Sequence, residues 1–224
     1  MTSQLNYLIA QQRHSELAAR AEQARLVGEA RVARSAQSPR RGRTCAAAAD
    51  RLVVADGMPI ALRQLSSADR AGLADLFGRL SAESRRRRFF SPKLELTPAE
   101  LTFFTDIDHL NHEAVAAVDQ RDNSIVGVAR YVRNTDGTGA AEVAFEVADA
   151  FQRIGIGTAL TGLTIYRAHT NGLRFLTATT LWENRAARRL LQNHGFRARG
   201  SHDGQIEHEL KLEEASPCDG VYVR

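Results

Sequence analysis

The alternation of apolar and polar positions divides the chain into four segments. In residues 1–34 the apolar positions recur at helical spacing along one thin stripe, among good helix formers such as Ala, Gln, Glu and Arg. Residues 35–50 combine Ser, Pro and Gly with an arginine cluster, which is typical of a linker. Residues 51–212 carry strand-like and helix-like periods in turn, and residues 213–224 are polar. An N-terminal helical extension, an Arg-rich linker and a C-terminal tail are therefore expected around one folded domain.

Residues 51–212 are predicted to form a mixed α/β sandwich. Apolar runs flank the turn Asp56-Gly57, and three further runs are separated by turn-type sequences, which favours an antiparallel meander. Strands are expected at 52–54, 60–62, 113–119, 124–132, 141–148, 174–180, 196–201 and 205–212. Helices are expected at 68–80, 81–90, 97–105, 157–170 and 184–194. Ser67 is expected to cap the first helix without a full capping box, because Arg70 lies three residues on.

A glycine loop at residues 152–158 joins an apolar strand to a helical pattern, which is an arrangement that holds phosphate. Gly155 and Gly157 let the backbone approach an anion, and the first N–H groups of the helix point toward it. The helix dipole adds a partial positive charge. The chain has no Gly-Lys-Ser/Thr of a Walker loop, and the next glycine, Gly162, is too far for a dinucleotide fingerprint. The loop predicts an enzyme with another kind of phosphate-bearing cofactor.

The spacing Gln-x-x-Gly-x-Gly resembles the acyl-CoA pyrophosphate loop of the GNAT superfamily of N-acetyltransferases. Downstream, Asn184 opens a helical segment that closes in Gly195-Phe196, similar to the usual end of the GNAT fold. Segments that resemble the bacterial protein-lysine acetyltransferase branch are Glu83-Ser84, Arg88-Phe89-Phe90, Asp106-Ile107-Asp108 and residues 127–131. The resemblance covers residues 51–212. It implies an α/β fold of the GNAT acyl-CoA N-acyltransferase type, in which helices flank a mixed central sheet with splayed strands.

The resemblance also implies acetyl-CoA as the cofactor. Its pyrophosphate would sit on the backbone N–H groups of the glycine loop, and its pantetheine arm would lie between the splayed strands 145–148 and 174–180. The backbone N–H of Val147 or Ala148 would stabilise the oxyanion. Asn184 would bond to the arm or to a water, or would simply cap its helix. The implied cofactor-binding residues are Val147, Ala148, Gln152, Arg153, Ile154, Gly155, Ile156, Gly157, Thr158 and Asn184.

The acceptor implied by the resemblance is an amine, which must lose a proton before it attacks the thioester directly. A lysine amine has a pKa near 10.4 and is almost fully charged at pH 7, so the site needs a general base. Glu142 occupies the position of the base in many GNAT enzymes, where it usually acts through water. Glu146 has the same parity on the strand and is the second candidate, and an exposed glutamate in a salt bridge is the alternative for either. Leu191 stands where many relatives carry a tyrosine, so the leaving-group acid is undefined.

Three functions remain open from the sequence. The first is an N-acetyltransferase that acts on protein lysine, and the second is an acetyltransferase for a small-molecule amine. The third is a catalytically silent CoA-binding regulator, with the N-terminal helix available for a partner or for self-association. The absence of the tyrosine favours the silent regulator, whereas the presence of Glu142 favours an enzyme.

Composition indicates in which compartment the protein is expected, but it does not define the chemistry. No apolar run reaches about 18 residues, so no membrane span is expected, and the N-terminus lacks a basic-then-apolar signal pattern. Cys45 and Cys218 lie in the linker and the tail, which favours a reducing cytoplasm. The net charge of +4 arises in the first fifty residues, which hold eight arginines and four acids, and the remainder carries 22 of each sign. Nucleic-acid binding is not expected, because no aromatic residues are interleaved with those arginines.

No metal site is predicted, because no Cys/His cluster has ligand spacing. His109 and His112 are three residues apart and are expected on a polar surface. The four arginines of residues 85–88 are expected on a solvated face, or else on the acceptor side, where they would prefer acidic surroundings. Trp182 is expected to pack in the core beside the splayed strand.

Overall fold

The structure is a computed structural model that describes residues 51–212, except residues 56 and 135. Its strands are β1 (Arg51–Ala55), β2 (Met58–Gln64), β3 (His112–Asp119), β4 (Ile125–Arg133), β5 (Ala140–Val147), β6 (Phe175–Leu181), β7 (Arg197–His202) and β8 (Gln205–Lys211). Its helices are α2 (Arg70–Arg79), α3 (Ala82–Phe89), α4 (Pro98–Thr105), α5 (Ile156–Thr170) and α6 (Arg185–Asn193), with 3₁₀ turns η1 (Ser67–Asp69) and η2 (Asp149–Phe151). The predictions for residues 1–34, 35–50 and 213–224 lie outside the described residues.

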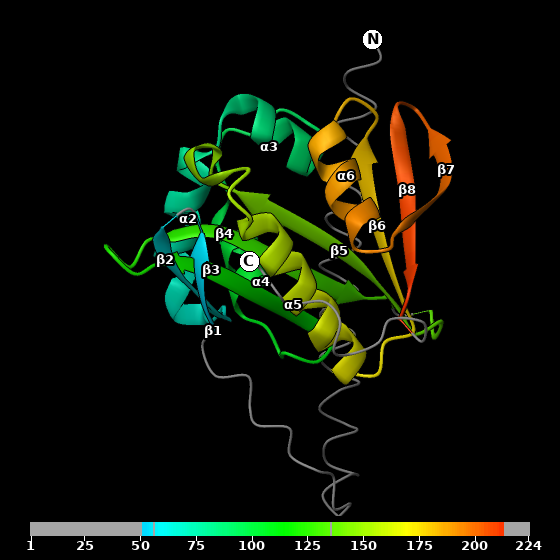
Figure 1. The fold of residues 1–224 in the computed structure, drawn as a ribbon, viewed down its shortest axis with the longest axis horizontal. Coiled ribbons are helices and arrows are strands. Elements are labelled where there is room, and N and C mark those ends of the chain that lie inside the picture. Colours follow the sequence, from blue (N-terminus) through cyan, green and yellow to red (C-terminus); the bar gives the residue numbers. More distant parts are fainter. Residues whose placement is uncertain (1–50, 56, 135, 213–224) are drawn as a thin grey trace, which may run out of the picture.

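The described strands form one mixed sheet in the order β1-β2-β3-β4-β5-β6-β8-β7 (Figure 1). Strands β3, β4 and β5 form the predicted antiparallel meander. Strand β6 pairs parallel with β5, and α5 supplies the crossover that a parallel pair requires. The parallel ladder has only three positions, from Ala140↔Phe175 to Glu142↔Thr177, and the two strands then diverge. The predicted splay is therefore present, with β5 and β6 as its two arms.

Helices cover both faces of the sheet. Helix α5 packs on one face through Leu160 and Leu163, and α6 extends that layer over β6 and β8 through Leu191. Helices α2 and α4 pack on the other face, where Leu76 and Phe104 share a core cluster with Ala114 and Ala116 of β3. Strand β3 is buried at every position, as expected for a strand covered on both faces. The core therefore has one layer on each face of the sheet. Where β5 and β6 diverge, the sheet that separates these two layers is open.

The start of the first helix differs from its prediction by one residue. Ser66, not Ser67, precedes the helical turn, and its N–H donates to Asp69 Oδ2 at 2.8 Å. Arg63 clamps the same carboxylate at 2.6 and 2.8 Å. The acid that completes this capping box therefore lies three residues from Ser66, so the predicted absence of a full box was wrong.

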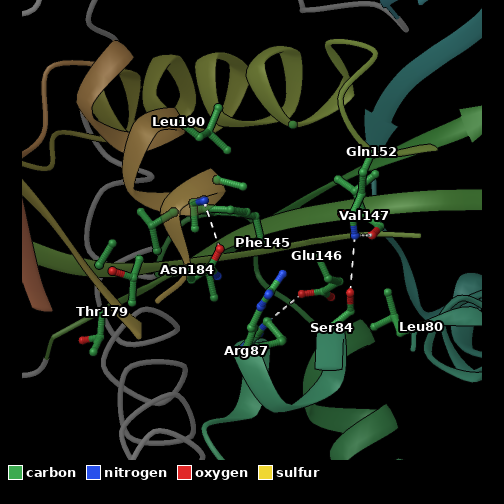
Figure 2. A pocket seen from close by; sticks show the side chains of 18 of the residues that line it. Leu80, Ser84, Arg87, Phe145, Glu146, Val147, Gln152, Thr179, Asn184 and Leu190 are labelled. Atoms are coloured by element: carbon green, nitrogen blue, oxygen red, sulfur yellow. Dashed lines mark hydrogen bonds and ion pairs between the residues drawn. The ribbon is translucent and has the colours of Figure 1, made fainter. Parts of the chain in front are cut away.

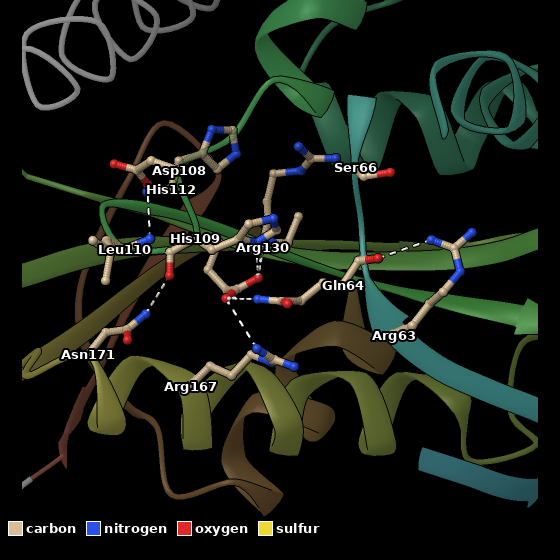
Figure 3. A network of polar contacts seen from close by, with 12 residues as sticks. Arg63, Gln64, Ser66, Asp108, His109, Leu110, His112, Arg130, Arg167 and Asn171 are labelled. Atoms are coloured by element: carbon tan, nitrogen blue, oxygen red, sulfur yellow. Dashed lines mark hydrogen bonds and ion pairs between the residues drawn. The ribbon is translucent and has the colours of Figure 1, made fainter. Parts of the chain in front are cut away.

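A network of polar side chains lies at the N-terminal end of β3 (Figure 3). His109 Nδ1 lies 3.0 Å from Glu113 Oε1, and Gln64 Nε2 donates to Glu113 Oε2 at 3.1 Å. His112 is 4% exposed and its ring lies 5.0 Å from that of Phe103, so the prediction of a surface position was wrong for this residue. Burial lowers the pKa of His112 to about 3, with Arg130 as a second cause. No group of three acidic, cysteine or histidine side chains in the described part could hold a metal ion.

Lowering the pH from 7 to 5 should lower the free energy of unfolding, and His112 should account for about 2 kcal/mol of the loss. The unfolded chain protonates this histidine near pH 6.5, whereas the folded protein keeps it neutral to about pH 3. Stability is therefore full above pH 6.5 and is lost as the pH falls below it. Urea unfolding at both pH values should show a loss about 2 kcal/mol smaller in His112→Phe, which keeps a ring against Phe103.

The control for this experiment is His202→Gln, because the His202 side chain is 85% exposed and should contribute little. Equal losses in wild type and His112→Phe would contradict the assignment.

Candidate active site

A cavity of about 280 Å³ occupies the space between the diverging strands. Figure 2 shows side chains from β5, β6, α3 and α6 and from the glycine loop converging on it. The predicted site residues that line it are Glu142, Glu146, Val147, Gln152, Arg153, Gly157, Thr158 and Asn184. The predicted residues that are not part of its lining are Ala148, Ile154, Gly155 and Ile156. Lining residues that the sequence did not suggest include Phe145, Ser84, Arg87, Thr179 and Thr180.

The edge of β5 that faces the cavity presents backbone groups without a strand partner. Ala148 N–H donates to Val126 O at 2.9 Å, and alternate residues of an antiparallel strand bond in the same direction. The backbone of Glu142, Ala144 and Glu146 therefore faces β4, whereas that of Phe145 and Val147 faces the gap left by β6. Buried groups of this kind cost of order 1–3 kcal/mol each when they lack a partner. The arrangement suits an extended ligand that bears amides.

This alternation corrects one of the two predicted oxyanion donors. The N–H of Ala148 is already used in the β4 ladder, and its residue is 3% exposed. Val147 N–H has the right direction, and so does Phe145 N–H, which the prediction missed. The sequence shows the strand but not which of its residues bond to β4, because that register depends on a partner strand.

The glycine loop forms a tight turn at the start of α5, as the sequence predicted, and its shape suits an anion. Gly155 has φ +95° and is the N-cap of α5, and the first intrahelical bond runs from Ala159 N–H to Gly155 O at 3.0 Å. The N–H groups of Ile156, Gly157 and Thr158, in the first turn of α5, therefore have no acceptor within the helix and are available to an anion. Ile154 and Ile156 themselves turn inward, since their side chains pack on the core beneath α5.

Gln152 links the loop to its surroundings. Its side-chain amide donates to Val147 O at 3.0 Å and to Ser84 Oγ at 3.4 Å (Figure 2). The glutamine thereby ties the end of β5 to α3, and Arg153 beside it is exposed with φ +64°. The role of Gln152 in this structure is to set the shape of the loop.

The two candidate glutamates lie on the same face of β5 but in different surroundings. Glu146 accepts from Arg88 Nε at 2.6 Å and lies 3.7 Å from an Arg130 nitrogen, with all three side chains at most 11% exposed. Glu142 lines the cavity at the last position where β5 pairs with β6. Glu146 is therefore held in a salt bridge, although a buried rather than an exposed one.

Arg130 shows how strongly this part of the site is desolvated. Its guanidinium lies over the Phe104 ring at 4.4 Å and donates to Phe104 O at 2.9 Å. Burial lowers the pKa of Arg130 to about 10, although the Glu146 carboxylate opposes that effect. The cluster of Arg88, Arg130 and Glu146 therefore carries one excess positive charge beneath the cavity.

The arginine row of α3 does not form a simple solvated face. Arg85 donates to Leu94 O and Gly78 O at 2.8 and 2.9 Å and covers Phe77, which is a structural role. Arg86 pairs with Glu83 and, across the mouth of the cavity, with Glu183. Arg87 and Arg88 line the cavity. These two arginines therefore form part of the cavity wall on the side of α3.

Three residues in or near α6 can also be compared with their predictions from the sequence. Asn184 caps α6, since its Oδ1 accepts from Ala187 N–H at 3.2 Å, and it also lines the cavity. Trp182 is 60% exposed beneath Arg188, so the prediction of core packing was wrong. Leu191 is fully buried in the core and has no proton to give.

A splayed sheet, a glycine turn at a helix start and a carboxylate in the intervening cavity define a CoA-type transferase site. Residues 81–196 match the model of the acetyltransferase (GNAT) family. An acetyltransferase of Pseudomonas aeruginosa is 32% identical over 161 residues, which cover 70% of this chain and 86% of that protein. The crystal structure of the GNAT domain of S. lividans PAT is 27% identical with a TM-score of 0.68, covering 72% of this chain and 96% of that one.

A further relative is acetyltransferase Pat of Mycolicibacterium smegmatis, which is 32% identical over 115 residues. The match covers 51% of this chain but only 34% of that longer protein. The present chain belongs to the acetyltransferase (GNAT) family. Membership confirms the predicted fold, the acetyltransferase class and its acetyl-CoA cofactor, and the relatives named Pat confirm the resemblance to the bacterial protein-lysine acetyltransferase branch. No described helix is long and apolar enough to cross a membrane.

Gly155→Ala should lower the free energy of unfolding by about 1–2 kcal/mol, because a Cβ is strained at positive φ. Gly157→Ala is the matched control in the same loop. Its Cβ would lie 3.4 Å from Leu190 Cδ2, which is an ordinary contact, so its stability should stay close to wild type. Chemical denaturation measures both variants, and equal losses would show that the left-handed turn at Gly155 is not the cause.

Proposed function

We propose that this chain transfers an acetyl group from acetyl-CoA to the side-chain amine of a protein lysine, with Glu142 as the general base. The observation that carries the proposal is the place of Glu142, which lines the cavity where β5 leaves β6. A carboxylate at this point lies on the same strand as the backbone that faces the gap, and the glycine turn that suits a pyrophosphate follows the other end of that strand.

The residues present fit the cofactor. The N–H groups of Ile156, Gly157 and Thr158 suit the pyrophosphate. The backbone of Phe145 and the N–H of Val147 suit the amides of the pantetheine arm, since Val147 O already accepts from Gln152. When bound, acetyl-CoA supplies a thioester carbonyl that an amine can attack. Val147 N–H, or Phe145 N–H before it, would donate a hydrogen bond to the carbonyl oxygen as negative charge builds there.

The base has to remove a proton from an ammonium group with a pKa near 10.4. A side chain placed for this work typically accelerates the reaction by about 10²–10⁴. Glu142 is partly buried and reaches the cavity from the α3 side of the sheet. Glu146 is less suited, because Arg88 and Arg130 already neutralise it. Arg87 borders the same side and would meet the surroundings of the acceptor amine.

Two observations support a protein acceptor over a small amine. The relatives named Pat belong to the branch that the sequence resembles. Arg87 of the cavity wall and the neighbouring Arg86 are more than a third exposed, and so is Glu183, which pairs with Arg86, so the cavity wall at α3 continues into an exposed charged surface. A small-molecule amine remains the second candidate, and the N-terminal extension of residues 1–34 remains a proposed element for a partner or for self-association. A cytoplasmic setting also remains a prediction.

A catalytically silent CoA-binding regulator is supported by Leu191, which offers no acid. The presence of the Glu142 carboxylate in the cavity supports an active enzyme instead. The two possibilities differ in what the loss of that carboxylate does.

Glu142→Gln should lower turnover of a lysine peptide by about 100-fold or more, because the amide cannot take the proton. Binding of CoA, measured by calorimetry, should be unchanged, because the backbone groups and the glycine turn remain. Glu146→Gln is the comparison on the same face of β5. It should act mainly on folding, with a loss of about 3–5 kcal/mol, because two buried guanidinium groups lose their carboxylate. Full activity of Glu142→Gln would refute the assigned base.

A panel of acceptors should separate the two enzyme functions. Lysine peptides should give a higher kcat/KM than polyamines or aminoglycosides if the acceptor is a protein. Thiol release with a colour reagent measures all of them under one condition. A preference for the small amines would overturn the protein-lysine proposal while leaving the acetyltransferase class intact.

A further inference from the structure

A buried histidine contacts the cavity through a threonine. His208 of β8 is 1% exposed, and its Nε2 lies 2.9 Å from Oγ1 of Thr180 on the neighbouring strand β6. Thr180 is 4% exposed and lines the cavity. It has the parity of Ala178, which packs with Leu191, so its side chain lies on the α6 face of the sheet. Neither residue belongs to the predicted site.

The hydrogen bonding of His208 determines which way its proton points. Its Nδ1 is buried and has no hydrogen-bond partner among the described residues. A proton on Nδ1 would be an orphaned buried donor, which proteins avoid more strictly than an unpaired acceptor. The proton is therefore on Nε2 and is donated to Thr180 Oγ1. The hydroxyl proton of Thr180 is left free to bond to a further acceptor.

The charge state of the histidine agrees with this arrangement. Burial lowers the pKa of His208, and the nearby Arg188 guanidinium lowers it further, so the ring is neutral at pH 7. Arg188 comes from α6, where it donates to Trp182 O at 3.0 Å and lies over the Trp182 ring. The positive charge of Arg188 therefore lies near His208 and Thr180 on the α6 face of the sheet. Glu142 and Glu146 lie on the other face of the sheet.

The reaction needs a donor for sulfur. When the C–S bond of the thioester breaks, its electron pair stays on sulfur, and a thiol with a pKa near 8.5 leaves as a thiolate. Among the hydroxyls of the cavity wall, Ser84 donates to Asp149 at 2.7 Å, and Thr158 lies exposed at the glycine turn. Thr179 points to the other face of β6, since strand residues alternate.

We propose that the Thr180 hydroxyl, held by His208, donates a hydrogen bond to the sulfur of CoA and stabilises it as a thiolate. The hydroxyl keeps its proton, because it is far less acidic than a thiol. The proton that finally neutralises the sulfur is the one that the amine nitrogen loses on forming the amide, and it arrives through solvent. Thr180 is thus a catalytic residue and His208 a positioning residue. This inference rests on the proposed function, because it requires CoA in the cavity.

The test is the acidity of the thiol of bound CoA, which absorbance of the thiolate near 240 nm reports. The pH titration uses the full chain with saturating CoA, with desulfo-CoA as the blank. In wild type the thiol should be about tenfold more acidic than in Thr180→Val, a shift of one pKa unit. Thr180→Ser restores a hydroxyl and should restore the acidity. Thr164→Val is the control, because Thr164 is buried and bonds to Leu160 O at 2.9 Å, outside the cavity wall.

His208→Phe tests the positioning role. It keeps a buried ring but removes the donor to Thr180, so the thiol acidity should fall toward that of Thr180→Val. Equal thiol acidity in wild type and Thr180→Val, with CoA bound in both, would overturn the inference and leave the acetyltransferase proposal standing. No binding of CoA to the wild type would instead refute the proposed function.

Discussion

The site depends on the early end of the parallel pairing between β5 and β6. Each of these strands keeps a long antiparallel partner on its other side, β4 for β5 and β8 for β6. The sheet can therefore open between them without the loss of either half. Pairing holds at three positions and ends at Glu142, and the unpaired part of β5 lies beyond that point. The backbone of Phe145 and Val147, the cavity and the glycine turn all follow from this divergence.

The contacts across the opening are weak compared with those that hold each half. Arg86 and Glu183 join α3 to the segment before α6 at 2.7 Å, but the two side chains are 38% and 50% exposed. Exposed pairs of this kind contribute about 0–1 kcal/mol, so this contact adds little to what holds the two halves together. Gln152, by contrast, holds the end of β5 to α3 from within the cavity wall. The glycine loop is therefore tied to α3 by side-chain hydrogen bonds, whereas α3 and the segment before α6 are joined only by an exposed ion pair.

Local signals in the sequence predicted the elements and the loop well. Period-two and helical patterns located the strands and helices of the described domain to within about two residues, and Gly155 and Gly157 marked the turn that opens α5. Errors arose wherever a partner far along the chain decides the outcome. Ala148 bonds to Val126, and His112 is buried through its contact with Phe103. Such pairings are set by the packed fold and have no signature in a short stretch of residues.

The two glutamates of β5 show how one strand comes to hold identical side chains in different surroundings. Glu142 and Glu146 have the same chemistry, the same face and the same strand, so the sequence alone ranks them only by family resemblance. In the fold, Glu146 meets Arg88 from α3 and Arg130 from β4, residues that lie 58 and 16 positions away, and becomes part of a buried ion cluster. Glu142 stands instead where the sheet opens. The difference is thus made by the neighbouring elements: α3 and β4 supply the arginines around Glu146, whereas Glu142 lies where β6 departs from β5.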